Sequence, residues 1–98
     1  MKLSELLLTG RANAVPGKEL VNLLGLKDLR ELTKVVERER REGTPICASV
    51  CGVRGYYLAE TPEELTAYLG SLYHREREVS RTRTALENIL AQWEAVRL

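Results

Sequence analysis

The chain has 98 residues, of which 44% are hydrophobic and 30% are charged, and its formal net charge is +1. This length supports one domain with a modest core, and the near-zero charge excludes a protein whose whole surface attracts nucleic acid. Residues 1–60 carry ten basic and eight acidic side chains, so any contact with DNA must come from a local basic patch.

The first ten residues, MKLSELLLTG, predict a short helix that ends near Thr9–Gly10. Leu3, Leu6 and Leu7 would form its apolar face. Because the apolar run is short and contains polar residues, it is not typical of a signal peptide or a membrane span. We therefore expect a cytoplasmic protein without a membrane partner.

Two further helices follow in the sequence. Residues 13–15 precede a proline and are expected to be extended. PGKELVNLLG then predicts a helix of about two turns, which Gly25 ends. Asp28 is placed to cap the next helix, from Leu29 to about residue 42, because its carboxylate can accept a backbone N–H. That third helix would bury an apolar face formed by Leu29, Leu32, Val35 and Val36.

The opposite face of the third helix is basic. At 100° per residue, Arg30, Lys34 and Arg41 fall almost opposite the apolar face, and Arg38 lies beside them. Periodicity leaves two interpretations open. The face contacts DNA, or it is solvated and stabilised by pairs such as Glu37 with Arg41.

Residues 46–58 predict a β-hairpin, because two alternating segments flank the glycine-containing turn CGVRG. Alternate residues share a face, so one face has Ile46, Ala48 and Val50 and the other has Cys47, Ser49 and Cys51. Arg54 lies at the tip. Tyr56 and Leu58 are expected to anchor the returning strand to the core, and of Tyr56 and Tyr57 one would lie inside and one outside.

The cysteines and the single histidine, His74, give little indication of chemistry. Cys47 and Cys51 form a C-x3-C pair, whereas structural zinc commonly takes four ligands from two paired motifs. Packing is the more common role of such cysteines. The sequence has no nucleophile–base arrangement and no phosphate-binding glycine loop. We therefore expect no metal, no cofactor, no small-molecule ligand and no enzymatic activity.

TPEE, residues 61–64, predicts the start of a long last helix. Thr61 would be the N-cap, Pro62 the first helical residue, and Glu64 the second half of a capping box. The following residues form a heptad seam with polar gaps: Leu65, Leu69, Leu72, Glu76, Val79, Arg83, Leu86, Leu90, Trp93 and Arg97.

The length of this helix bears on the assembly. A continuous helix of about 34 residues would be about 50 Å long, and a domain of this size is only about 30 Å across. The helix therefore either breaks near Ser80–Thr84 and folds back, or it pairs with another copy. We expect a homodimeric coiled coil, with contacts from Leu86, Ile89, Leu90 and Trp93.

Several motifs in order resemble a winged helix-turn-helix over residues 3–60. They are the Leu-Leu-Gly-Leu corner at 23–26, the R-R-E-G-x-P-I exit at 40–46, and the G-Y-x-L strand at 55–58. The run GRANAVPGKELVNLLGL…REL…REGTPICA…GYYLA…PEEL is similar to small winged-helix proteins of bacterial prophages. Glu39 departs from the pattern, because such third helices usually carry an apolar residue there.

The resemblance implies a mostly helical α+β fold, a winged helix-turn-helix with three helices and a β-hairpin wing over residues 1–60, followed by a C-terminal dimerisation helix over 61–98. It also implies binding of double-stranded DNA by a prophage regulator, for example in transcription, or by an accessory factor in DNA metabolism. The third helix would enter the major groove and the wing would touch the DNA backbone or minor groove. The implied DNA-binding residues are Lys18, Lys27, Arg30, Lys34, Arg38, Arg41 and Arg54. The alternative is a protein-interaction module that keeps the winged fold without binding DNA.

Overall fold

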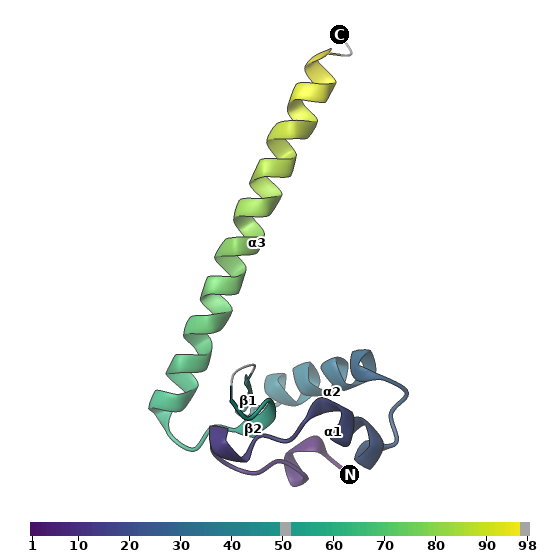
Figure 1. Ribbon diagram of the computed structural model, residues 1–98, viewed down its shortest axis with the longest axis vertical. Coiled ribbons are helices and arrows are strands. Elements are labelled where there is room, and N and C mark those ends of the chain that lie inside the picture. The colour runs from purple at the N-terminus through teal and green to yellow at the C-terminus, as the bar shows by residue number, and fades with distance from the viewer. Residues whose placement is uncertain (50–51, 97–98) are drawn as a thin grey trace. The chain divides into compact units, whose positions relative to one another are not determined.

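The computed structural model describes residues 1–49 and 52–96 and has an α+β architecture (Figure 1). The elements in chain order are the 3₁₀ turns η1 (Leu3–Glu5) and η2 (Arg11–Asn13), the helices α1 (Gly17–Leu24) and α2 (Leu29–Arg41), the strands β1 (Ile46–Ser49) and β2 (Gly55–Leu58), and the long helix α3 (Pro62–Val96). The chain divides into two compact units, Met1–Tyr68 and Leu69–Leu98. The first unit therefore includes the start of α3.

The N-terminal segment is not the helix that its leucine spacing predicts. Only one 3₁₀ turn forms, Leu3–Glu5, although Leu3 and Leu7 are buried as expected. After that turn the backbone lies beside β2, where the N–H of Leu58 donates to the carbonyl of Leu8 (2.8 Å) and the N–H of Gly10 donates to the carbonyl of Leu58 (2.9 Å). These long-range bonds use the groups that a helix would have paired within itself.

The pair α1–α2 forms as predicted, with a tight corner between the helices. Gly25 has a left-handed backbone (φ 67°), and the N–H of Leu26 donates to the carbonyl of Val21 (2.9 Å). One predicted core residue is wrong: Leu29 is half-exposed. Its Cδ2 would be 2.9 Å from a Cβ added at Gly17, so this side chain packs over the start of α1.

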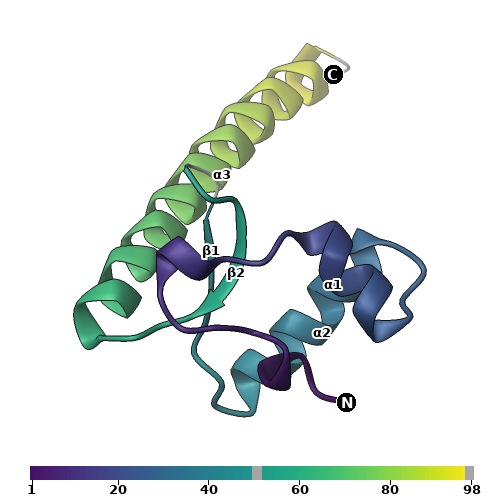
Figure 2. The ribbon, with the colours of Figure 1, turned by 60° about the horizontal axis from the view of Figure 1, so that its bottom comes forward.

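The hairpin pairs β1 and β2 in antiparallel register, with Cys47 opposite Tyr57 and Ala48 opposite Tyr56 (Figure 2). Val15 adds a third backbone segment beside β2, because its N–H and carbonyl both bond to Tyr56 at 2.8 and 2.9 Å. The extended conformation predicted at residues 13–15 is therefore confirmed at Val15, while Asn13 belongs to η2.

Both faces of the hairpin are packed, so the expectation of one inner and one outer tyrosine is wrong. Tyr57 is buried in a small cluster with Cys47 and Ala14, and the half-buried Tyr56 and Leu58 pack on the main cluster. The main cluster contains Leu3, Leu7, Leu20, Leu32, Val36 and Ile46. The expected orientations of Val50 and Cys51 lie outside the described residues.

Thr61 caps α3 as predicted, but Glu64 does not complete the expected capping box, because its carboxylate accepts the N–H of the residue before the cap. The N–H of Glu64 donates to Oγ1 of Thr61 (3.2 Å), and Oε1 of Glu64 accepts from the N–H of Glu60 (3.1 Å). The helix is continuous from Pro62 to Val96, so the break considered near Ser80–Thr84 does not occur. Over the part of the chain that is described, no helix combines the length and the apolar character needed to cross a membrane.

Candidate nucleic-acid interface

The outer face of α2 is the basic face that helical periodicity predicts. Asp28 caps the helix with its Oδ1 on the N–H of Glu31 (3.0 Å), which fixes where the helix starts and which residues share a face. Leu32, Val36 and Glu39 are buried on the inner side. The four cations of the opposite side, Arg30, Lys34, Arg38 and Arg41, are all exposed. They extend over about 16 Å of helix.

Two of the three glutamates within α2 are withdrawn from this face. Oε2 of Glu31 accepts the backbone N–H of Lys27, the residue before the N-cap, at 2.9 Å. Glu39 is 2% exposed, and its two carboxylate oxygens accept the N–H groups of Leu3 (2.7 Å) and Ser4 (2.9 Å). Only Glu37 lies among the four cations. The outer face is therefore more positive than the composition of the helix indicates.

Arg40 has a different role from its neighbours on α2. Its Nε donates to the carbonyl of Ile46 (2.8 Å), and one terminal nitrogen donates to the hydroxyl of Tyr68 (2.9 Å). The guanidinium carbon lies 5.2 Å from the centre of the Tyr68 ring. Arg40 thus connects α2 to β1 and to the start of α3, and it does not belong to the outer face.

Lys18 and Arg30 lie on one hollow between α1 and α2. Its volume is about 540 Å³, and it is lined by Lys18, Val21, Asn22, Asp28, Leu29 and Arg30. The floor is apolar and the cations come from the first turn of each helix. The structure therefore brings together the predicted contacts Lys18 and Arg30, which are twelve positions apart in the sequence.

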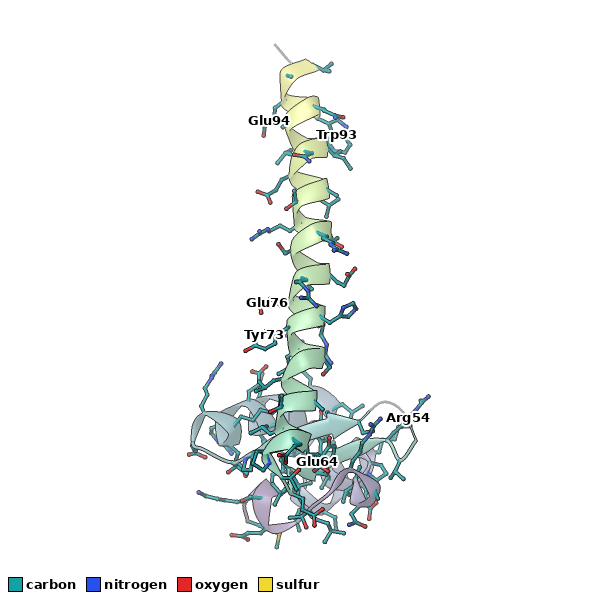
Figure 3. The ribbon with its side chains drawn as sticks, turned by 90° about the vertical axis from the view of Figure 1, so that its left-hand side faces the viewer. Arg54, Glu64, Tyr73, Glu76, Trp93 and Glu94 are labelled. Carbon is teal, nitrogen blue, oxygen red and sulfur yellow. The ribbon has the colours of Figure 1, made fainter. Side chains whose placement is uncertain are left out.

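Lys27 and Arg54 are exposed, each on a different connection. Lys27 lies in the corner between α1 and α2, and Arg54 lies in the hairpin loop between β1 and β2 (Figure 3). Across residues 1–49 and 52–96, none of the seven predicted DNA-contacting cations has an acidic partner within 4.0 Å, and both ion pairs found are in α3. The stabilising pairs considered for the α2 surface, such as Glu37 with Arg41, are not formed.

No protein-family model, no curated protein and no solved structure matches the chain. The assignment of a function therefore depends on the residues and their geometry alone.

Arg11 is a further cation near the hairpin that the sequence analysis did not single out. Its Nε donates to Oγ of Ser49, the last residue of β1, at 3.2 Å, and the side chain is otherwise exposed. The sequence gives no local signal for this contact, because the two residues are 38 positions apart.

Cys47 is a buried packing residue. It is 0% exposed and lies beside Tyr57. Burial raises the pKa of the Cys47 thiol, although a hydrogen bond with Tyr57 opposes part of that rise. Within the described residues, no three His, Cys, Asp or Glu side chains form a group able to hold a metal ion. Cys51 lies outside those residues, so the C-x3-C pair stays a sequence feature.

Proposed function

We propose that the first unit binds double-stranded DNA as a small winged helix-turn-helix. The order of elements supports this fold: α1, the corner at residues 25–28, α2 and a hairpin. The isolated bridge between Val15 and Tyr56 lies where a winged helix has its short first strand, which supports this assignment. In this assignment η1 takes the place of the family's first helix, and Glu39 holds that turn on α2.

The outer face of α2 carries the proposal. Four exposed cations lie on one side of a helix, while Glu31 and Glu39 are engaged elsewhere by backbone N–H groups. A helix of this kind can enter the major groove, where arginine donates two bonds to guanine and lysine neutralises phosphate. We assign base contacts to Arg30 and Lys34. Backbone contacts are assigned to Lys18, Lys27, Arg38, Arg41 and Arg54.

The binding test compares two variants that lose the same charge. Fluorescence anisotropy with labelled duplexes of mixed sequence should show that Arg30→Ala with Lys34→Ala weakens binding by more than about tenfold. The control, Arg75→Ala with Arg77→Ala, removes two positive charges from α3 and should change affinity by less than about threefold. Equal effects of both pairs would contradict the assignment to α2.

Glu37 provides a test in the opposite direction. It is the remaining carboxylate among the four cations, so it should repel phosphate. Glu37→Gln should tighten duplex binding by about threefold or more at low salt, and this gain should disappear as salt rises. Unchanged affinity would show that this face does not approach DNA.

Salt dependence separates DNA binding from the alternative function. Four or more phosphate contacts predict a log–log slope of affinity on salt of about −4 or steeper. A protein-interaction module would show no measurable duplex binding even at low salt, and that result would favour the alternative.

A further inference from the structure

The second unit exposes an apolar seam along α3. No residue of α3 is buried, and the exposed fractions of Leu86, Leu90 and Trp93 are 60%, 52% and 66%. Together with Leu69, Leu72 and Val79 these side chains follow a repeat of seven residues. A lone helix in water is not stabilised by such a seam, whereas a pair of helices is.

Glu76 and Trp93 belong to the same seam but project to different sides of α3 (Figure 3). Part of this difference comes from their two different core positions, and the rest is expected from winding of the seam around a straight helix. A strict seven-residue repeat drifts by about 20° per heptad on a straight helix, and supercoiling around a partner removes this drift. The winding is therefore expected for an unpaired helix that carries a coiled-coil sequence.

The two charged positions of the seam determine which partner and which direction fit. Leu69, Glu76, Arg83 and Leu90 occupy one type of core position, and Leu72, Val79, Leu86 and Trp93 occupy the other. A parallel pair of identical helices would place Glu76 against Glu76 and Arg83 against Arg83. Both contacts bring like charges together in the core, which is unfavourable.

An inverted copy has the complementary pattern. Apolar residues lie at both ends of the seam, and Glu76 and Arg83 lie on opposite sides of its middle, residue 81, five and two residues away from it. We propose that α3 pairs with α3 of a second copy in antiparallel orientation, with Glu76 of each chain beside Arg83 of the partner subunit. This inference is independent of DNA binding, because it uses only the second unit.

The register follows if the two antiparallel seams overlap along their whole length, from residue 69 to residue 93. Leu69 then lies opposite Trp93 of the partner subunit, Leu72 lies opposite Leu90 of the partner subunit, and residue 81 is at the centre. In this register Glu76 and Arg83 of the partner subunit are about one turn apart along the axis, within reach of their long side chains. Nε of Arg83 contacts Glu87 of its own helix at 3.3 Å on the surface, and the guanidinium keeps further donors for Glu76.

Charge reversal in the full chain tests both the partner and the direction. Sedimentation equilibrium should find the wild-type protein dimeric at micromolar to tens-of-micromolar concentration. Glu76→Arg alone and Arg83→Glu alone should each weaken the dimer by about tenfold or more, because each places two like-charged pairs in the interface. The double variant, Glu76→Arg with Arg83→Glu, restores opposite charges and should return to within about threefold of wild type.

The same four proteins distinguish the other arrangements. In a parallel dimer every variant still places like charges together, so the single and double variants would resemble wild type, and that pattern would overturn the proposal. A wild-type monomer at the highest concentration would overturn it as well. The contact between Arg83 and Glu87 is lost in both Arg83→Glu proteins, so recovery in the double variant isolates the pairing between chains.

Two controls keep the comparison specific to the seam. Arg77→Glu and Glu78→Arg make the same charge changes on the solvent side of the heptad and should leave the dimer unchanged. The only tryptophan, Trp93, gives an optical readout. Its quenching by iodide should fall when wild type or the double variant dimerises, and it should stay high in the single variants.

Discussion

The carboxylate of Glu39 holds the backbone of Leu3 from a position 36 residues further along the chain. Its Oε2 accepts the Leu3 N–H at 2.7 Å in a buried site, and its Oε1 accepts the next N–H, that of Ser4, at 2.9 Å. These are two of the N–H groups that a 3₁₀ turn leaves unpaired at its start. A charged residue on the inner side of α2 is therefore satisfied by the turn that packs on it.

Removing this carboxylate should destabilise the first unit. Glu39→Ala removes the acceptor of one buried and one partly buried N–H group and opens a cavity, and should lower the free energy of unfolding by about 2–4 kcal/mol. Glu39→Gln keeps the volume but presents an NH₂ group to one of the two N–H donors, so its cost should be smaller, about 1–2 kcal/mol. Urea denaturation followed by circular dichroism measures both changes.

The control for Glu39 is Glu37, two residues away on the exposed side of the same helix. Glu37→Ala should change the free energy of unfolding by no more than about 0.5 kcal/mol. A similar cost for the two glutamates would show that the buried contacts of Glu39 contribute little.

The close approach of the Val15 segment to β2 requires glycine at position 55. Gly55 has φ 140°, and a Cβ added there would collide with the carbonyl of Val15. Because the colliding atoms are backbone, Gly55→Ala must separate residue 15 from β2 and should cost about 3 kcal/mol or more. Thermal unfolding is the measurement.

Gly52 is the matched control for Gly55. It lies in the hairpin loop that precedes β2 and has φ 65°, and a Cβ there would meet nothing within 4 Å. Gly52→Ala should therefore show only the left-handed backbone penalty of about 1–2 kcal/mol. A smaller loss for Gly55→Ala than for Gly52→Ala would show that the approach of residue 15 to β2 does not require glycine.

Those parts of the fold that local chemistry determines were predictable from the sequence. Gly25 ends α1, Asp28 caps α2, and Thr61 with Glu64 begins α3, and each signal acts within a few residues of the element that it positions. The basic face of α2 was predictable for the same reason. Once the start of a helix is fixed, its geometry determines which side chains share a side.

The features that sequence reasoning missed depend on partners far along the chain. The turn at Leu3 is held by Glu39, and Ser49 is contacted by Arg11, 38 residues away. Arg40 looks like the neighbouring Arg41 in the sequence, and only the positions of Ile46 and Tyr68 make it a structural residue. Such pairings are set by tertiary packing, which one sequence does not reveal.

Arg40 and Arg41 should show opposite roles although they are adjacent and carry the same charge. Arg40→Ala leaves the carbonyl of Ile46 and the hydroxyl of Tyr68 without this donor and should cost about 1.5–3 kcal/mol of stability. Arg41→Ala removes an exposed cation and should leave stability within about 0.5 kcal/mol, while it weakens duplex binding. Denaturation and DNA titration of both variants give the comparison, and a stability loss confined to Arg41→Ala would contradict it.

Tyr68→Phe separates the two contributions of Tyr68 to the Arg40 contact. The substitution keeps the ring under the guanidinium and removes the hydroxyl that accepts from Arg40. Its cost should be about 0.5–1.5 kcal/mol, less than that of Arg40→Ala, because the bond to Ile46 and the cation–π contact remain. A larger loss than for Arg40→Ala would place most of the stabilisation in contacts of Tyr68 with other groups.

Alkaline pH should lower the free energy of unfolding through the buried thiol of Cys47. Burial raises the thiol pKa above its ordinary value, so the folded state favours the neutral thiol more strongly than the unfolded state does. The resulting stability is present in full below the unfolded-state pKa, about 8.5, and is lost as pH rises toward the folded-state pKa.

The test compares Cys51→Ser with the double variant Cys51→Ser, Cys47→Ala. Above about pH 9, the free energy of unfolding should fall more steeply in Cys51→Ser than in the double variant. The pKa of Tyr57 is also raised by burial, so a smaller alkaline decline should remain in the Cys47→Ala protein. Identical pH profiles for the two proteins would show that the Cys47 thiol does not titrate against folding.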